Sequence, residues 1–282
     1  MTQATLAERL GYGALDRLLI VNCDDLGASH GANVATQRAL KSGAISKSAS
    51  LMVPCPQAFE AAQMLKGHPI GIHLTVTSEY RAHRWRGLTE GASLYDDRGF
   101  LWQSRDAALA HLTVADAHAE CHAQIAAALA WGVDVSHLDT HMNVLQERSD
   151  LYDVLFDLAL EFRLPIRMFP RHHTDAQGFR APERAQARGI VINDHMIDRW
   201  PEFTSDILRD EIPKLPPGVT VVYAHPVDDG EELRGYDYPH LAPLRASDAM
   251  CVCDEAIAAV LDQHSVRCIG FGALRDLQRA AC

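Results

Sequence analysis

Short runs of apolar residues alternate with longer amphipathic stretches along most of the chain. The short runs, bounded by turn-forming residues, predict strands at 18–22, 48–53, 70–74, 136–138, 165–169, 190–192, 220–223 and 267–271. The amphipathic stretches predict helices at 31–42, 57–65, 114–131, 150–162, 205–214 and 247–263. Such regular alternation is typical of βα units arranged around a parallel sheet.

The order of these elements predicts a single α/β domain over residues 1–282, a distorted or incomplete TIM-like (β/α) barrel. An open doubly wound sheet fits less well, because no glycine-rich phosphate loop follows the first predicted strand. The pattern breaks at 75–104, where aromatic residues stand among charges and glycines without a clean period. So long a loop in a compact chain is usually functional, and we expect a lid or a binding wall there.

Composition and charge narrow the class of protein. Hydrophobic residues make up 48% of the 282 residues, enough for a complete core. The 26 basic and 37 acidic residues leave a net charge of -11, which argues against binding to nucleic acid. No stretch resembles a signal peptide or a membrane span, and the seven cysteines form no C-x-x-C pair. We therefore expect a cytoplasmic protein without a nucleic-acid or membrane partner.

Two adjacent carboxylates, Asp24 and Asp25, follow the first predicted strand directly. Like charges this close raise at least one pKa unless a cation or a proton lies between them. The pair therefore predicts either a metal site or acid/base chemistry, and the alternative is a solvated turn. His73 lies near the end of the third predicted strand, where it is either a site residue or a hydrogen-bonded core histidine.

Further polar residues fall at the ends of later predicted strands. His137, Asp139 and His141 alternate along the chain, so they share one face of the fourth strand. Arg167 lies in the predicted strand 165–169, and His225 follows the predicted strand 220–223. Because βα barrels place their reactive groups at the carboxyl ends of the strands, we expect these side chains to converge. The alternative is that His137 and His141 lie in a surface loop and that their spacing is accidental.

One aspartate and two histidines from neighbouring strands would leave coordination positions open on a divalent ion. Such a set suits Zn²⁺, whereas Mg²⁺ prefers more oxygen ligands. The second aspartate could then act as a general base, and His225 could protonate a leaving amine. Asp139 could orient an imidazole ring or fix its tautomer.

Five motifs together carry a resemblance to a known family. They are LIVNCDDLG at 19–27, GIHLT at 71–75, HLDTH at 137–141, PIRM at 165–168 and the His-Pro pair at 225–226. In this order and spacing, the chain resembles the YdjC-like carbohydrate deacetylase family, which includes chitooligosaccharide deacetylases and hopanoid-associated HpnK-type proteins. The similarity runs from Leu18 nearly to the C-terminus.

The resemblance implies that Asp25, His73 and His141 bind one divalent metal ion, Mg²⁺ or Zn²⁺. It further implies that Asp24 is the general base and His225 the general acid. The implied fold is an incomplete or distorted TIM-like barrel, often a homodimer. The implied reaction is hydrolysis of the N-acetyl group of an amino sugar.

The chain departs from the family pattern at three places. Met142-Asn143 follow the second histidine motif where further histidines are common, and Val227 follows the late His-Pro where glycine is common. The loop 78–102 is also longer and more aromatic. These departures bear mainly on the substrate.

Four residues are candidates for contact with the substrate. Tyr80 and Trp85 could stack on sugar faces, and the alternative is that they pack the loop onto the barrel or form a dimer contact. Arg167 is expected to be functional, because an unpaired arginine that faces a barrel interior is costly. Asp139 belongs to the same predicted site.

The sequence thus predicts a metal-dependent hydrolase that removes an N-acetyl group from an amino sugar or a related small N-acetylated compound. One alternative is a metal-dependent sugar isomerase or epimerase on a similar barrel, which would need more carboxylate ligands. Another is a carbohydrate-binding protein without catalytic activity.

Overall fold

The computed structural model describes residues 4–236 and 240–280, which form one parallel sheet surrounded by helices. The strands are β1 (Arg17–Leu26), β2 (Ser48–Leu51), β3 (Pro69–Leu74), β4 (Asp134–Thr140), β5 (His195–Met196), β6 (Gly218–Ala224) and β7 (Val266–Cys268). The helices are α1 (Leu6–Arg9), α2 (His30–Ser42), α3 (Ala58–Met64), α4 (Arg105–His111), α5 (Val114–Ala130), α6 (Ser149–Phe162), α7 (Arg171–Gln177), α8 (Ala181–Ala187), α9 (Thr204–Glu211), α10 (Glu231–Arg234), α11 (Ala242–Cys251), α12 (Glu255–Gln263) and α13 (Phe271–Ala280). Short 3-10 helices are η1 (Ala92–Leu94), η2 (His141–Gln146) and η3 (Ile212–Lys214).

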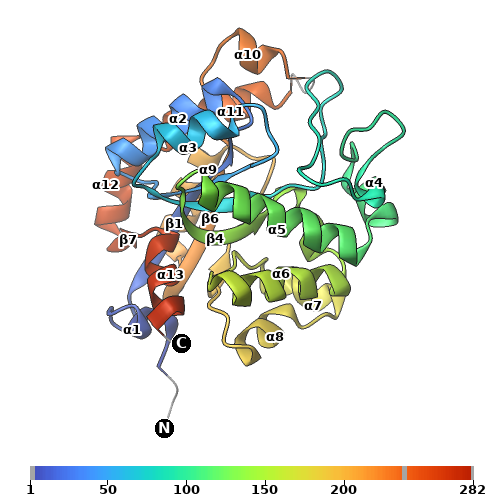
Figure 1. Ribbon diagram of the computed structural model, residues 1–282. Coiled ribbons are helices and arrows are strands. Elements are labelled where there is room, and N and C mark those ends of the chain that lie inside the picture. Colours follow the sequence, from blue (N-terminus) through green and yellow to red (C-terminus); the bar gives the residue numbers. More distant parts are fainter. Residues whose placement is uncertain (1–3, 237–239, 281–282) are drawn as a thin grey trace.

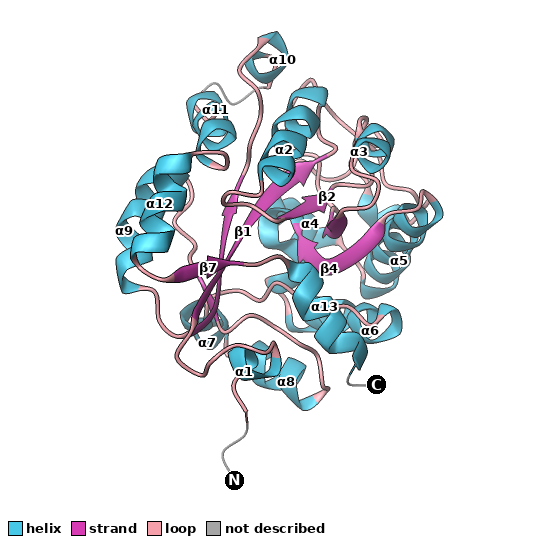
Figure 2. Ribbon diagram, turned by 90° about the vertical axis from the view of Figure 1, so that its left-hand side faces the viewer, coloured by secondary structure: helices cyan, strands magenta, loops and turns pink. Residues whose placement is uncertain are grey.

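The sheet curls into a distorted barrel. Its strand order is β4-β3-β2-β1-β6-β5, with β7 beside the start of β1, and all pairs are parallel. Isolated bridges from Leu138 to Ile166 and from Ile166 to Ile192 continue the sheet from β4 towards β5. Figure 2 shows the strands in the middle of the molecule and the helices around them. The predicted fold class, a distorted or incomplete barrel in a single domain, is confirmed.

Two of the predicted strands are reduced to single bridges. At 165–169, Pro165 has no N–H to donate to a ladder, which limits pairing to the bridge at Ile166. At 190–192, the side chain of Asn193 takes over the pairing with Met168. Its Oδ1 accepts from the Met168 N–H at 2.8 Å, and its Nδ2 donates to the Met168 carbonyl at 3.0 Å.

The single long helix predicted at 247–263 is wrong. The structure has two helices there, α11 and α12, which meet between Cys251 and Glu255. The side chain of Asp254 accepts a hydrogen bond from the N–H of Ala256 and so caps the start of α12. An aspartate in this position favours a new helix start over helix continuation.

The barrel interior changes from apolar to polar along β1. Leu18 and Ile20 belong to an apolar cluster that also contains Phe271 of α13. Asn22 and Asp24 follow at the same two-residue spacing and are buried. The intervening Leu19, Val21 and Cys23 pack in the larger core cluster that joins the strands to the helices. Along β1, this layering places Asn22 and Asp24 towards the carboxyl end of the barrel.

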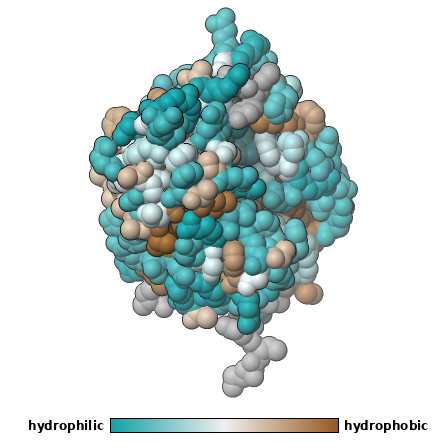
Figure 3. All heavy atoms as spheres, turned by 90° about the vertical axis from the view of Figure 1, so that its right-hand side faces the viewer, coloured by the Kyte–Doolittle hydropathy of each residue, from teal (hydrophilic) through white to brown (hydrophobic). Residues whose placement is uncertain are grey.

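Residues 75–104, drawn in teal between β3 and α4 in Figure 1, form an irregular loop segment. Bridges between Thr77 and Trp102 and between Tyr95 and Leu101 fold it back on itself. The face shown in Figure 3, which looks onto the right-hand side of Figure 1, is mostly hydrophilic, with small separate apolar groups. Within the described ranges, every helix is too short or too polar to cross a membrane.

Candidate functional site

Asp24 and Asp25 both face one cavity at the carboxyl end of the barrel. Consecutive residues of a regular strand point to opposite faces, so the alternation has to break here. It does so because Asp25 has a left-handed φ of 61° and the β1–β2 register is irregular between Cys23 and Leu26. A non-glycine residue in that region carries backbone strain, which is commonly found at functional sites.

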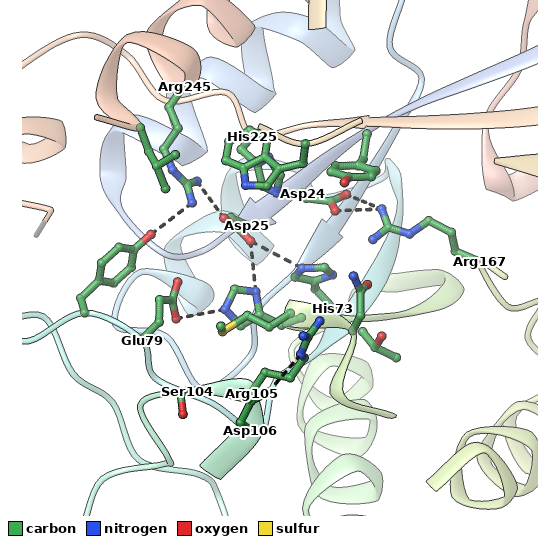
Figure 4. A pocket seen from close by; sticks show the side chains of 18 residues that line it. Asp24, Asp25, His73, Glu79, Ser104, Arg105, Asp106, Arg167, His225 and Arg245 are labelled. Atoms are coloured by element: carbon green, nitrogen blue, oxygen red, sulfur yellow. Dashed lines mark hydrogen bonds and ion pairs between the residues drawn. The ribbon is translucent and has the colours of Figure 1, made fainter. Parts of the chain in front are cut away.

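Two imidazoles point at the same oxygen of Asp25. The Oδ1 atom of Asp25 lies 3.5 Å from His73 Nε2 and 3.4 Å from His141 Nδ1 (Figure 4). All three residues are buried, with exposed fractions of 2%, 2% and 5% for Asp25, His73 and His141. Among the described residues, no well-formed hydrogen bond reaches Asp25 Oδ1. The three ligand atoms lie within 4.8 Å of one another, so this group can hold a metal ion.

The nitrogen of each ring that faces away from Asp25 meets another carboxylate. His73 Nδ1 lies 2.8 Å from Asp139 Oδ2, and His141 Nε2 lies 3.0 Å from Glu79 Oε2. Because a carboxylate only accepts, it fixes the proton on that nitrogen and leaves the other nitrogen free to bind a metal. The donor set therefore fits the divalent ion that the sequence predicts.

A second group, formed by Asp24, His73 and Asp139, is also close enough to hold an ion. Both carboxylates of this second group already form ion pairs with Arg167. Arg167 Nη1 lies 2.8 Å from both oxygens of Asp24, and Arg167 Nη2 lies 2.6 Å from Asp139 Oδ1. The structure therefore favours the group around Asp25, and it gives Arg167 two buried carboxylate partners.

Burial and the guanidinium groups of Arg167 and Arg245 shift the pKa values of the buried aspartates in different directions. Burial raises the pKa of Asp24, although Arg167 opposes it. Burial acts in the same direction on Asp25, but Arg245, whose Nη1 lies 2.7 Å from Asp25 Oδ2, holds the pKa of Asp25 well below its ordinary value. The pKa of Asp139 is also lowered, since Arg167 and His73 outweigh burial. Asp24 is thus the carboxylate whose environment best suits proton transfer.

His225 follows β6 and lines the same cavity. Its backbone N–H donates to Asp248 Oδ2 at 2.8 Å, which ties the end of β6 to α11. The imidazole packs against Trp200 with 4.3 Å between ring centroids, and its Nδ1 is buried without a hydrogen-bond partner among the described residues. Burial lowers the pKa of His225 to about 3, so the ring is neutral at physiological pH.

His137 lies in β4, as Asp139 does, and His141 follows that strand, but His137 does not line the cavity. Its ring stacks on Phe271 with 3.9 Å between centroids, and Nδ1 lies 3.0 Å from Ser136 Oγ. Burial lowers its pKa to about 3. It is therefore a neutral packing residue one layer below the site.

The cavity has a volume of about 490 Å³ and is bounded by strand ends, the 75–104 segment, and the starts of α4 and α11. Of the residues predicted from the sequence, most line it; these are Asp24, Asp25, His73, Tyr80, His141, Arg167 and His225. Asp139 is fully buried behind His73.

Trp85 lies apart from the cavity lining. Only 4% of its surface is exposed, and its indole Nε1 donates to the Thr77 carbonyl at 2.8 Å. Arg84, its neighbour, donates to the Leu101 carbonyl at 2.6 Å. Both contacts hold the loop together. The loop nevertheless reaches the cavity through Glu79 and Tyr80.

Sequence reasoning missed several residues of the site, namely Glu79, Trp200, Tyr223, Arg245 and Asp248. Glu79 and Trp200 lie in irregular segments, where no periodicity indicates the direction of a side chain. Tyr223 stands two residues before His225, so strand alternation places it on the face of His225. Arg245 lies in the first turns of α11 rather than at the end of a strand, and no pattern in the chain pointed to it.

Known proteins resemble the chain along most of its length. Residues 18–263 match the family model of the YdjC-like protein. A carbohydrate deacetylase of Thermus thermophilus is 40% identical over 160 residues, 56% of either chain. A carbohydrate deacetylase of Thermoanaerobacter pseudethanolicus is 28% identical over 225 residues, 77% of this chain and 84% of the relative.

A chitooligosaccharide deacetylase of Yersinia enterocolitica is 30% identical over 192 residues, 66% of this chain and 68% of the relative. In the relative from Thermus thermophilus and in a carbohydrate deacetylase of Geobacillus stearothermophilus, the aligned part spans little more than half of the relative's length, 56% and 60%. A crystal structure of a protein from Enterococcus faecalis V583 superposes with a TM-score of 0.76 at 21% identity, covering 92% of this chain and 99% of that one, which shows the shared fold. With a family match over this range and the aspartate–histidine site inside it, the chain belongs to the YdjC-like protein family.

Proposed function

We propose that the protein is a metal-dependent hydrolase that removes the N-acetyl group from an amino sugar or a related small N-acetylated compound. One observation carries the proposal. Asp25 Oδ1, His73 Nε2 and His141 Nδ1 converge in an open cavity, and a second carboxylate, Asp24, stands beside them. The names of the relatives, carbohydrate deacetylase and chitooligosaccharide deacetylase, support the same class of reaction.

Asp25, His73 and His141 would hold the ion. When bound, a divalent ion polarises the acetyl carbonyl and acidifies water, which is the chemistry that amide hydrolysis needs. Two imidazoles in the set favour Zn²⁺ over Mg²⁺, which prefers a shell of oxygen ligands.

Asp24 acts as the general base and takes a proton from the attacking water. Burial raises its pKa, which makes the carboxylate a better proton acceptor than an exposed aspartate. Arg167 contacts both Asp24 oxygens and Asn22 Nδ2 donates to Oδ1 at 2.6 Å, so the carboxylate is held in one orientation. An oriented base avoids reorganisation during the reaction.

His225 acts as the general acid towards the departing amine. Because its pKa is lowered to about 3 in the free site, the imidazole is neutral before the reaction. It therefore takes up a proton from solvent in the open cavity within the catalytic cycle, as negative charge builds up on the substrate beside it, and passes that proton to the amine nitrogen. Asp24 releases the proton of the attacking water to solvent as acetate leaves. Trp200 and Tyr223 line the same side of the cavity and offer aromatic faces to a sugar ring.

The alternative isomerase or epimerase function is less well supported. Metal-dependent sugar isomerases need several carboxylate ligands, and here Arg167 occupies both Asp24 and Asp139. That leaves Asp25 as the carboxylate shared by the two imidazoles. The homodimer and the cytoplasmic location expected from the sequence stay predictions.

The proposal is tested by acetate release. The purified protein is incubated with N-acetylated mono- and oligosaccharides, first after removal of metal with a chelator and then after addition of Zn²⁺ or Mg²⁺. We expect acetate only in the metal-loaded samples, and none from Asp25→Asn under the same conditions. Equal acetate release with and without metal, or an isomerised sugar with its acetyl group intact, would contradict the proposal.

A further inference from the structure

Glu79 supports His141 from the 75–104 segment. Its carboxylate Oε2 accepts from His141 Nε2 at 3.0 Å, opposite the nitrogen that faces Asp25. Only 8% of Glu79 is exposed, and the side-chain amide of Gln103 donates to its backbone carbonyl at 3.1 Å. Figure 4 shows this chain of contacts from Glu79 through an imidazole to Asp25.

The other imidazole, that of His73, is supported by a carboxylate in the same way. Asp139 holds His73 at 2.8 Å through Nδ1, and His73 Nε2 then faces Asp25. Each ring therefore stands between a supporting carboxylate and the shared oxygen of Asp25. Asp139 comes from the barrel strand β4, whereas Glu79 comes from the irregular segment that follows β3.

We infer that Glu79 is a positioning residue that fixes the tautomer and ring orientation of His141, so that the 75–104 segment completes the metal site. This inference rests on the metal centre of the proposed function. A carboxylate that accepts from the second nitrogen of a metal-binding imidazole raises the basicity of the ring and holds it in place. Loss of such a carboxylate typically costs about 10- to 100-fold in metal affinity.

Charge supports the same role. The contacts described above join four carboxylates, those of Asp24, Asp25, Glu79 and Asp139, to two guanidinium groups, those of Arg167 and Arg245. Metal ligation requires both imidazoles to be neutral. In that state, with ionised carboxylates, the network would carry two negative charges, which one divalent cation would balance. Without the charge of Glu79, the network would carry one negative charge and would not balance a divalent cation. An unbalanced charge in a buried site is costly.

The test measures metal binding without substrate. Co²⁺ is titrated into the metal-free full-length protein, and the dissociation constant comes from the visible absorption band, checked by competition with a chelator. We expect Glu79→Ala to weaken Co²⁺ binding by at least about tenfold and to change the shape of the band. Glu79→Gln keeps an oxygen acceptor for His141 Nε2, so it should recover part of the loss.

Glu120→Gln is the matched control. Glu120 is a buried glutamate of α5 that accepts from the backbone N–H groups of Leu88 and Thr89 at 3.0 and 2.9 Å, so it fastens the same segment. Its carboxylate accepts from Leu88, Thr89 and Gln124, and not from the ring nitrogens of His73 or His141. We expect its Co²⁺ affinity to stay within about twofold of the wild type, since the segment is loosened without loss of the His141 contact.

The outcomes separate cleanly. A loss smaller than tenfold in Glu79→Ala, or an equal loss in Glu120→Gln, would overturn the role of Glu79. Failure of the wild-type chain to bind Co²⁺ would overturn both this role and the metal centre. Co²⁺ binding without acetate release would contradict only the proposed function, because the affinity comparison needs no turnover.

Discussion

Asp24 and Asp25 are neighbours in the chain, yet their partners give them different chemistry. Arg167 holds Asp24 through both oxygens, while burial keeps its pKa raised. Arg245 holds one oxygen of Asp25 and leaves the other directed at two imidazoles. The positive φ of Asp25 is what allows both side chains to reach the same cavity.

This difference predicts the behaviour of Asp24→Asn. The amide keeps the shape of the side chain but cannot accept a proton, so we expect acetate release to fall by about two orders of magnitude or more. Metal content, measured by elemental analysis, should stay at the wild-type level, because Asp25, His73 and His141 are unchanged.

The control for Asp24→Asn is Asp157→Asn, which breaks a surface ion pair with Arg188 at 3.1 Å. It should retain wild-type turnover and metal content. Wild-type turnover in Asp24→Asn would show that another group is the base.

At this scale the sequence predicted the residues that end strands. Asp24, Asp25, His73 and His141 all follow or end predicted strands, and barrel topology alone brings such ends together. Glu79 and Arg245 were not predictable in this way. Glu79 reaches the site only through the path of an irregular loop, and Arg245 does so from a helix whose place depends on tertiary packing.

Among the elements, the pairing of β3 with β4 depends on a close approach. The register shifts between Ile70 and Ile72, where β4 has one extra residue and His137 lies over Gly71. A Cβ atom at Gly71 would lie 2.1 Å from Cε1 of the His137 ring, so the backbone of β3 and the imidazole fit only with glycine. The extra residue makes a β-bulge in β4, and this bulge sets how far along the barrel axis Asp139 and His141 lie.

Gly71→Ala is therefore expected to lower the free energy of unfolding by about 1–3 kcal/mol, the usual cost of overpacking a core. Urea denaturation measures it. The double variant Gly71→Ala/His137→Ala should lose less than the sum of the two single variants, since removal of the ring relieves the clash.

Gly230→Ala is the control for this substitution, because a Cβ built there meets no atom within 4 Å among the described residues, its chain neighbours aside. It should change stability by only a few tenths of a kcal/mol. Additive losses in the double variant would mean that the clash does not determine the cost.

Element prediction failed where side chains replaced regular backbone pairing. The apolar segments at 165–169 and 190–192 have strand-like composition, but Pro165 and the side chain of Asn193 reduce them to bridges. The segment 247–263 has a continuous helical period, and a single cap at Asp254 divides it. Strands with both neighbours in place, such as β1 and β6, were predicted to within a few residues.

For the whole molecule, a buried carboxylate joins the outer helices to the carboxyl end of the barrel. Asp248 of α11 is 1% exposed, and its Oδ2 accepts from the backbone N–H of His225 at the end of β6. Burial raises the pKa of Asp248 to about 6, although hydrogen bonds from His225 and Thr204 oppose the shift. The folded chain therefore binds this proton more tightly than the unfolded chain does.

The sign of the resulting pH dependence follows from linkage. Between the ordinary aspartate pKa and about 6, the folded state holds more protons than the unfolded state, so the stability contributed by Asp248 is complete below this window and is lost as pH rises through it. A difference of about two pKa units corresponds to roughly 2–3 kcal/mol.

Asp248→Asn removes this titration, so the stability of the wild type relative to the variant should fall by about that amount from pH 4 to pH 7. Urea unfolding of both proteins across this range measures the difference, with Asp228→Asn, which breaks a surface pair with Arg38, as the control expected to show no such trend. A difference between wild type and Asp248→Asn that stays constant over the range would mean that Asp248 titrates in the folded chain as it does in the unfolded one.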